Sequence, residues 1–469
     1  MTAAAPPIEE LLAQGENLVH ARRFGEAEAC ANAVLARQPR NPRGHYILAL
    51  CALFQQRPQA AAESLVRALK QERTTAQYHF VLGMALAALG RHGDAVLSYR
   101  RALQFRPQFF EALANMGSAL EASRRFEEAR DVYRRALALR QEALLFNGLG
   151  LCELALGELP AAGAAFERAL QLKPDFTTAL NNWATVLGKT GQRERAVEML
   201  RRATQLRPDF LEAWVNLGEQ LYMGRDDAGA IAAFDRVLAL DPANDEIRYL
   251  RDSIAGVNVE RAPDQFVRNF FDRFAREFDQ RLTQDLGYRA PEEMARFLAR
   301  WLEGREGLRV VDLGCGTGLS GIFIRPRAGR LVGVDLSGEM LARARERGIY
   351  DELVQAEIAG FLAVQPPASV DLALAADVFV YVGRLDEVLR TCAAALAPGG
   401  LFAFSVEDLA EQGGEGFRLA RTGRYAHARD YVQAAGSQAG LALRDSEAVV
   451  LRHDDGKPVA GRFYAFGKD

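Results

Sequence analysis

The first half of the chain repeats one pattern of small and large apolar residues. Seven units follow one another between residues 8 and 242, and corresponding positions lie 33 or 34 residues apart. An alanine recurs at the same place in every unit: Ala27, Ala61, Ala95, Ala129, Ala162, Ala196 and Ala230. Four residues later, every unit but the first carries a larger side chain: Leu65, Tyr99, Tyr133, Phe166, Leu200 and Phe234. Small residues let two helices approach closely and large ones fill the groove between them, so the pattern predicts stacked helix pairs.

The period of these units is typical of a repeat architecture. In the last unit Trp214, Leu217, Gly218, Phe234 and Pro242 are in register, and the spacing resembles the tetratricopeptide repeat (TPR). The resemblance implies a right-handed solenoid with a concave face. We expect the TPR solenoid to cover residues 8–256, with about seven repeats and a polar capping helix near residues 244–254.

Four asparagines recur at nearly the same phase of the expected first helices: Asn115, Asn147, Asn181 and Asn216. Two interpretations are open. The side-chain amides could hold an extended peptide through paired donors and acceptors. Alternatively, they are surface asparagines that this repeat favours.

After residue 256 the period stops and the hydrophobic pattern changes. Residues 257–304 are expected to form a helical cover, because phenylalanines between Phe266 and Phe278 recur at helical spacing. In residues 305–469 short apolar runs alternate with helical segments, which predicts a parallel sheet with helices on both faces. Two alternating runs around Asp455 and Gly456 predict a closing hairpin. The expected fold class is therefore an all-helical solenoid followed by an α/β domain.

A glycine-rich turn follows the first apolar run of this second domain. Residues 310–313 (VVDL) lead into residues 314–318 (GCGTG). Glycines in such a turn adopt positive φ and let the backbone touch a ligand. Asp335 ends the next expected strand, where a carboxylate can accept both hydroxyls of a ribose. Two ligand classes remain open at this point, because residues 316–321 also fit the GxGxxG pattern of nicotinamide dinucleotide sites.

Four features favour S-adenosylmethionine as the ligand. Asp312 precedes the first glycine, the segment SGEML at residues 337–341 follows Asp335, Pro398-Gly399-Gly400 precedes the fifth strand, and a hairpin closes the chain. Together they resemble the class I methyltransferases with a DxGCGTG loop. The resemblance implies a Rossmann-like domain with a mostly parallel seven-stranded sheet and a C-terminal antiparallel hairpin. It also implies S-adenosylmethionine as the cofactor.

The same resemblance assigns cofactor-binding roles along the chain. The methionine half is expected to lie against Asp312, Gly314, Cys315, Gly316 and Gly318, and the ribose against Asp335. The adenine is expected beside Leu336, Met340, Glu357 and Ile358, and the sulfonium above Asp377 and Val378. Tyr288 and Arg289 are expected to approach the carboxylate of the cofactor from the helical cover.

Tyr381 and His427 are the candidate catalytic residues. Methyl transfer from a sulfonium is a direct displacement that requires no metal, and a base helps only where the acceptor carries a proton at neutral pH. Tyr381 follows the fourth strand and faces the expected acceptor pocket. His427 lies in a polar segment after the fifth strand and is either a base or a surface histidine. The fourth strand ends in Ala376-Asp377-Val378-Phe379, without the prolines of nucleic-acid amino methylases.

Composition narrows the partners and the compartment. Apolar residues make up 49% and charged residues 25% of the chain, and the formal net charge is −3, which gives no general attraction to nucleic acid or anionic membranes. No apolar stretch is long enough for a membrane span. The five cysteines are scattered, with no CxxC pair, which favours a cytoplasmic protein without disulfides.

Because solenoids offer long grooves, we expect a peptide or protein acceptor on the concave face. One alternative is a small-molecule methyltransferase whose repeats mediate homo-oligomerisation or recruit a partner. A third is a scaffold whose catalytic domain no longer binds a ligand.

Overall fold

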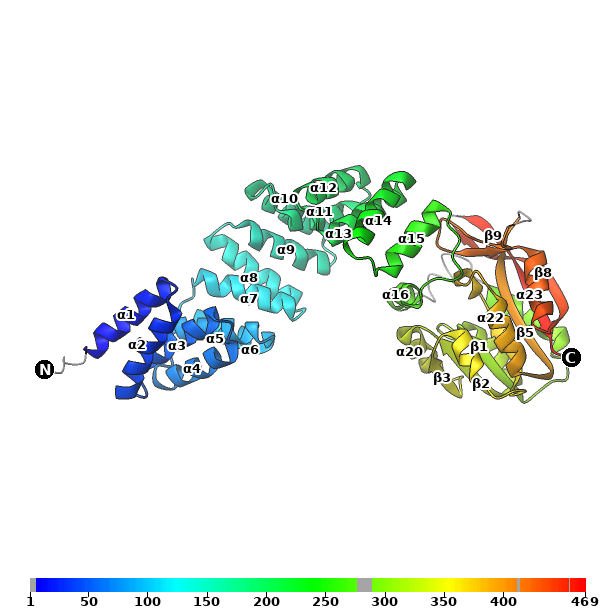
Figure 1. Ribbon diagram of the computed structural model, residues 1–469, viewed down its shortest axis with the longest axis horizontal. Coiled ribbons are helices and arrows are strands. Elements are labelled where there is room, and N and C mark those ends of the chain that lie inside the picture. Colours follow the sequence, from blue (N-terminus) through cyan, green and yellow to red (C-terminus); the bar gives the residue numbers. More distant parts are fainter. Residues whose placement is uncertain (1–5, 276–288, 411–413, 455) are drawn as a thin grey trace. The chain divides into compact units, whose positions relative to one another are not determined.

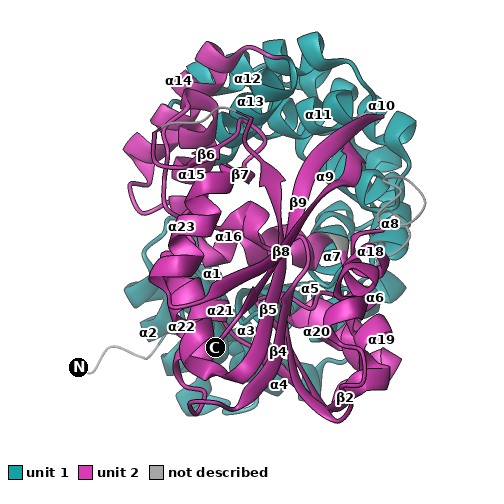
Figure 2. Ribbon diagram, turned by 90° about the vertical axis from the view of Figure 1, so that its right-hand side faces the viewer, with its two compact units in different colours: residues 1–224 teal, residues 225–469 magenta. Residues whose placement is uncertain are grey.

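The computed structural model describes residues 6–275, 289–410, 414–454 and 456–469. The chain divides into two compact units, Met1–Gly224 and Arg225–Asp469 (Figure 2). No helix among the described residues is long and apolar enough to cross a membrane.

The first unit is built from paired helices of nearly equal length, each packed against the next along the chain (Figure 1). They are α1 (Ile8–His20), α2 (Phe24–Arg37), α3 (Pro42–Phe54), α4 (Pro58–Gln71), α5 (Ala76–Ala88), α6 (His92–Phe105), α7 (Phe110–Ala122), α8 (Phe126–Leu139), α9 (Ala143–Ala155), α10 (Leu159–Leu172), α11 (Thr177–Lys189), α12 (Arg193–Leu206) and α13 (Leu211–Met223). The repeating alanines of this unit are completely buried, which confirms the predicted helix-pair solenoid.

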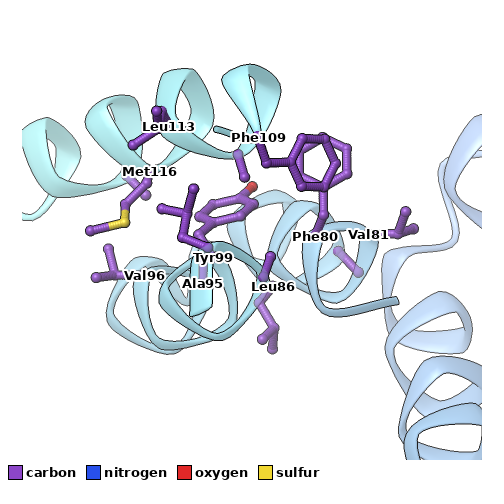
Figure 3. Packing of buried hydrophobic residues seen from close by; sticks show 14 of the residues in the cluster. Phe80, Val81, Leu86, Ala95, Val96, Tyr99, Phe109, Leu113 and Met116 are labelled. Atoms are coloured by element: carbon purple, nitrogen blue, oxygen red, sulfur yellow. The ribbon is translucent and has the colours of Figure 1, made fainter. Parts of the chain in front are cut away.

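In three helix pairs a glycine of the first helix contacts an aromatic ring of the second. A Cβ placed on Gly83 would lie 2.4 Å from the ring of Tyr99. Gly117 and Tyr133 stand in the same relation in the next repeat, at 2.5 Å. Figure 3 shows Tyr99 together with Phe80 in the buried cluster between these helices. The ring on the second helix therefore fits because the residue it contacts on the first helix is glycine.

Two of the recurring asparagines accept a bond from an asparagine of the following repeat. Asn182 donates from Nδ2 to Oδ1 of Asn147 at 3.0 Å, and Asn216 donates to Asn181 at 2.8 Å. Asn147 and Asn181 are buried. Asn147 and Asn181 are therefore not surface residues, and their carbonyls already accept a bond from the following repeat.

The second unit begins before the predicted end of the solenoid. It contains α14 (Asp227–Leu240) and α15 (Asp245–Ala255), although the sequence pattern assigns both to residues 8–256. Gly256 ends α15 in the left-handed conformation, with φ of 68°. Then follow α16 (Asp264–Phe274), α18 (Ala290–Leu298) and the short helix Ala299–Trp301.

A nine-stranded, mostly parallel sheet forms the centre of this unit. Its strands are β1 (Leu308–Leu313), β2 (Ala328–Asp335), β3 (Glu352–Gln355), β4 (Val370–Ala375), β5 (Leu396–Asp408), β6 (Phe417–Leu419), β7 (Tyr425–His427), β8 (Ala442–Asp454) and β9 (Lys457–Gly467). Parallel pairing joins β3, β2, β1, β4 and β5, and β9 adds antiparallel to β5 with β8 outside it. These seven strands and their closing hairpin are the sheet expected from the sequence. The pair β6 and β7 is an addition beside the carboxyl end of β5.

Helices cover both faces of the sheet. The helices are α19 (Leu319–Ile324), α20 (Gly338–Arg347), α21 (Ile358–Ala363), α22 (Asp386–Ala395) and α23 (Arg429–Gln438). Alternate residues of β1 enter different cores: Val311 and Leu313 pack with α21 and α22, whereas Val310 packs with α18. Because β1, β2 and β4 run parallel, the loops that follow them lie at the same edge of the sheet. In α/β proteins the faces are covered by helices and this edge binds ligands.

Candidate active site

A cavity of about 290 Å³ lies at the carboxyl ends of β1, β2 and β4. Eleven of the residues predicted from the sequence line it: Gly314, Cys315, Gly316, Asp335, Leu336, Met340, Glu357, Ile358, Asp377, Val378 and Tyr381. These residues come from separate loops and helix starts. The topology of the sheet therefore brings together a set that is spread over 68 positions of the chain (314 to 381).

The turn after β1 depends on its glycines. Gly314, Gly316 and Gly318 have φ of 66°, 54° and 92°. A Cβ on Gly314 would lie 2.5 Å from Val378, so this position combines a left-handed backbone with close contact to the loop after β4. Gly318 supports the turn but does not line the cavity.

Asp335 ties the glycine turn to the end of β2. Its Oδ2 accepts the backbone N–H of Gly316 at 2.9 Å, and its Oδ1 accepts that of Ser337 at 2.8 Å. Burial raises the pKa of this carboxyl, and the backbone donors act in the opposite direction. Each carboxylate oxygen has two acceptor sites, so Asp335 can still accept hydroxyls from a ligand.

Asp312 lies beneath the turn and does not line the cavity. It is 1% exposed, and Tyr350 donates its hydroxyl to Oδ2 at 2.7 Å. Burial, with a smaller contribution from Asp335, raises the pKa of Asp312 to about 7, although the Tyr350 bond lowers it. The predicted contact of Asp312 with the methionine half, directly or through water, stays a prediction.

On the β2 side the cavity is apolar with one further carboxylate. Leu336, Met340 and Ile358 line it, and Met340 is held at the start of α20 by its N–H bond to Ser337 Oγ. Glu357 caps α21 by accepting the N–H of Gly360 at 2.7 Å, and its other oxygen lies 3.5 Å from Arg261.

The helical cover contributes α16, not the residues before α18. Phe270 and Phe271 of α16 line the cavity, and the ring of Phe271 meets Tyr381 edge-on at 5.5 Å. Arg289 is exposed, pairs with Glu292 at 3.2 Å and does not line the cavity. Its predicted contact with the carboxylate of the cofactor stays a prediction. Tyr288, for which the same contact is predicted, lies outside the described residues.

Three arginines that the sequence pattern did not single out also line the cavity: Arg261, Arg424 and Arg452. Arg452 is 2% exposed and bonds Asp377 at 2.9 Å and Glu407. Although burial opposes its charge, the carboxylates of Asp377 and Glu407 raise the pKa of Arg452. The register of β8 and β9 shifts between Val450 and Arg452, and such a bulge re-aims a side chain that simple alternation would place on the other face.

Asp377 itself adopts an unusual backbone conformation at the end of β4. Its φ is 57°, a region that costs energy for a residue with a side chain. Its N–H donates to Ser405 Oγ at 2.7 Å, and its carboxylate is held by Arg452. Bonds to both ends of the residue keep it in this conformation at the cavity wall.

His427 does not reach the cavity. It is completely buried in β7, and its Nε2 lies 3.0 Å from the carbonyl oxygens of Val382 and Gly383, to which it donates. Burial lowers its pKa to about 4. Neither predicted role fits, because the side chain is neither a base facing the cavity nor a surface histidine.

Arg424 is placed by contacts from the start of the second unit. It lies at the turn between β6 and β7, where Tyr249 of α15 donates its hydroxyl to the carbonyl of Gly423 at 2.8 Å. Asp227 of α14 accepts two bonds from Arg421, at 2.6 and 2.8 Å. These contacts explain why α14 and α15 belong to the unit that contains the sheet.

The segment after α15 continues this support. The side chain of Asn258 bonds the backbone of β6 at both Phe417 and Leu419, at 2.8 and 2.7 Å. Ala262 then donates to the carbonyl of Tyr381 at 2.9 Å. One stretch of chain thus braces the β6–β7 hairpin and the loop of Tyr381.

The described residues fit S-adenosylmethionine. The positive φ values of the turn and its lack of side chains leave room for a ligand to approach the backbone. Asp335 and Glu357 offer acceptors for hydroxyl and amino donors, between apolar side chains that suit a flat base. The negative charges of Asp335 and Glu357 also suit a ligand whose sulfur and ammonium group are positively charged.

Two family models match different parts of the chain. The family described as "Methyltransferase domain" matches residues 311–402, and the family described as "Tetratricopeptide repeat" matches residues 12–68, 52–108, 115–175 and 181–245. A trans-aconitate 2-methyltransferase of Paracidovorax citrulli is 43% identical over 101 residues, which are 21% of this chain and 38% of that protein. A ubiquinone biosynthesis O-methyltransferase of Idiomarina loihiensis is 33% identical over 115 residues, 23% of this chain and 46% of that protein.

The solenoid half also has similar solved structures. The C-terminal part of a TPR repeat-containing protein from Cytophaga hutchinsonii covers 50% of this chain and 98% of its own, with 17% identity and a TM-score of 0.43. The chain spans less than half the length of the two methyltransferases that it matches.

Proposed function

Because the chain combines TPR repeats with a methyltransferase domain, we propose that it is an S-adenosylmethionine-dependent methyltransferase whose solenoid binds a peptide or protein acceptor and presents it for methylation. The observation that carries the catalytic part is the cavity at the carboxyl ends of β1, β2 and β4, with its glycine turn and Asp335. All five cysteines are free thiols, which supports a reducing compartment such as the cytoplasm.

The residues of the chain have two tasks in this reaction. When bound, S-adenosylmethionine supplies a methyl group on a positively charged sulfur. The glycine turn, Asp335 and Glu357 hold the cofactor. The rings of Phe270 and Phe271, which line the cavity, exclude water from it. Direct displacement gains most of its rate from such alignment and dryness.

The alternative acceptor is a small molecule, in which case the repeats serve self-association or recruitment. The two methyltransferase relatives favour this alternative, since their names indicate trans-aconitate and a ubiquinone precursor as substrates. The length of the repeat array favours the peptide, because solenoids of this kind provide extended binding surfaces.

One labelling experiment separates the two. The full chain is incubated with methyl-labelled S-adenosylmethionine and a cell extract, and the label is measured in the protein fraction and in the small-molecule fraction. Label in protein supports the proposal, and label confined to small molecules supports the alternative. The variant Asp335→Ala is the control for enzyme-dependent transfer. Absence of label in both fractions would contradict the catalytic assignment.

A further inference from the structure

We propose that the group methylated by this protein is a carboxylate, which Arg424 binds in the cavity and which reacts at oxygen without a general base. The proposal rests on the methyltransferase function proposed above and names the acceptor chemistry of the same site.

The first argument is the distribution of charge on the acceptor side of the cavity. Three arginines line the cavity; Arg261 is matched by Asp264 and Glu357. Arg452 is matched by the carboxylates of Asp377 and Glu407. Arg424 pairs with Asp454 at 3.0 Å. The side chain of Asp454 is 43% exposed and does not line the cavity. The pair is only partly buried, so solvent screens the attraction between its two charges.

Arg424 can hold a ligand without giving up that pair. A guanidinium has five N–H donors in a planar fork, and the bond to Asp454 uses one nitrogen. Tyr381, which also bonds Arg424, places a phenol beside it. A guanidinium next to a hydroxyl is a good fit for the two oxygens of a carboxylate.

The second argument is that no described lining residue can act as a base for a protonated acceptor. The lining contains no histidine or lysine in the part of the chain that the structure describes. His427 is turned away, toward the carbonyls of Val382 and Gly383. Burial raises the pKa of both Tyr381 and Cys315, so neither is deprotonated at neutral pH.

The carboxylates that line the cavity either pair with arginines or lie at the cofactor end. Asp377 is bonded to Arg452, Asp264 to Arg261, and Asp335 and Glu357 lie at the cofactor end. Alcohols and amines keep their proton at neutral pH and require a base, whereas a carboxylic acid with a pKa of about 4 is already ionised.

The reaction balances without a proton transfer. A carboxylate oxygen forms a bond to the methyl carbon while the carbon–sulfur bond breaks, and the electron pair of that bond returns to sulfur. The products are a methyl ester and a neutral thioether. The negative acceptor and the positive sulfonium also attract each other in a cavity of low dielectric constant.

The carboxylate has two possible sources, a free organic acid or an acidic residue of a peptide. The test uses the full chain saturated with S-adenosylhomocysteine, so that binding is measured without turnover. Calorimetric titrations compare tricarballylate, its trimethyl ester, and a short peptide with blocked ends and one glutamate. Binding of tricarballylate indicates a free acid, and preferential binding of the peptide indicates a peptide carboxylate.

Variants then test the role of Arg424. Arg424→Gln should weaken binding of the carboxylate probe by about tenfold or more, since a charge-assisted bond is lost, and should leave S-adenosylhomocysteine affinity unchanged. Arg424→Lys should recover part of the loss. The matched control is Arg418→Gln, an exposed arginine of the same hairpin that does not line the cavity, and it should bind as the wild type does.

The proposal is overturned if no carboxylate probe binds, if the ester binds as well as the acid, or if Arg424→Gln binds like the wild type. After turnover, mild alkali should release the transferred methyl group as methanol, and a methyl group stable to alkali would also overturn it. A wild-type chain that fails to bind S-adenosylhomocysteine contradicts the proposed function itself, which separates the two failures.

Discussion

Substitution of Asp312 by asparagine should make the methyltransferase unit more stable at neutral and alkaline pH. Asp312 is buried beneath the glycine turn, and burial raises its pKa to about 7 in the folded protein. An unfolded chain has an aspartate pKa of about 3.9. The folded state therefore binds the proton more tightly, and this stabilising contribution is complete below about pH 4 and is lost as pH rises through 7.

The size of the effect follows from the difference in pKa between the folded and unfolded states. A difference of about three, at about 1.36 kcal/mol for each, corresponds to about 4 kcal/mol of stability lost by the wild type between pH 4 and pH 8. The asparagine of the variant has no charge to bury and still offers an oxygen to the Tyr350 hydroxyl. For a unit of this size, about 4 kcal/mol corresponds to a difference in melting temperature of roughly 8–16 °C.

Calorimetry between pH 4 and pH 8 measures this difference. The transition of the methyltransferase unit is identified as the one that S-adenosylhomocysteine shifts. The melting temperatures of wild type and Asp312→Asn should diverge as pH rises, because all other titrating groups are common to both. Parallel curves across this range would refute the argument that Asp312 is held protonated by burial.

Two further predictions concern packing. Gly117→Ala should destabilise the solenoid by about 1–3 kcal/mol, since its Cβ would lie 2.5 Å from the ring of Tyr133, whereas Gly93→Ala, with no atom within 4 Å, should not; thermal unfolding followed by circular dichroism compares them. Tyr249→Phe removes the bond to the carbonyl of Gly423 and should cost about 1–3 kcal/mol, visible as faster hydrogen exchange in residues 417–427, and unchanged exchange there would argue against bracing of the hairpin by α15.

The parts of the fold that the sequence predicted are those set by local spacing. The seven repeats follow from alanines and large residues at fixed positions, and the structure buries those alanines completely. The glycine turn was recognisable for the same reason, because Gly314 to Gly318 are adjacent in the chain.

The parts that it did not predict depend on contacts between distant segments. Arg452 reaches Asp377 across 75 positions and through a bulge that the alternating pattern of β8 does not reveal. Arg421 meets Asp227 across 194 positions, and no local spacing predicts that α14, whose sequence fits the repeat, also contacts the unit of the sheet. The burial of His427 was not predictable from its segment, which also contains Arg424 and Arg429, because the groups that surround it, the carbonyls of Val382 and Gly383 and the ring of Tyr431, are distant or non-adjacent in sequence.

The most direct test of the account is a calorimetric titration of the full chain with S-adenosylhomocysteine. The wild type should bind it in the cavity and should not bind NAD. Asp335→Ala should bind it about 10- to 150-fold more weakly, because a charged acceptor is lost. The control Asp371→Ala removes a carboxylate that pairs with Arg309 outside the cavity, and should bind normally. Equal affinity of Asp335→Ala and wild type, or binding of NAD in place of S-adenosylhomocysteine, would contradict the assignment of this cavity.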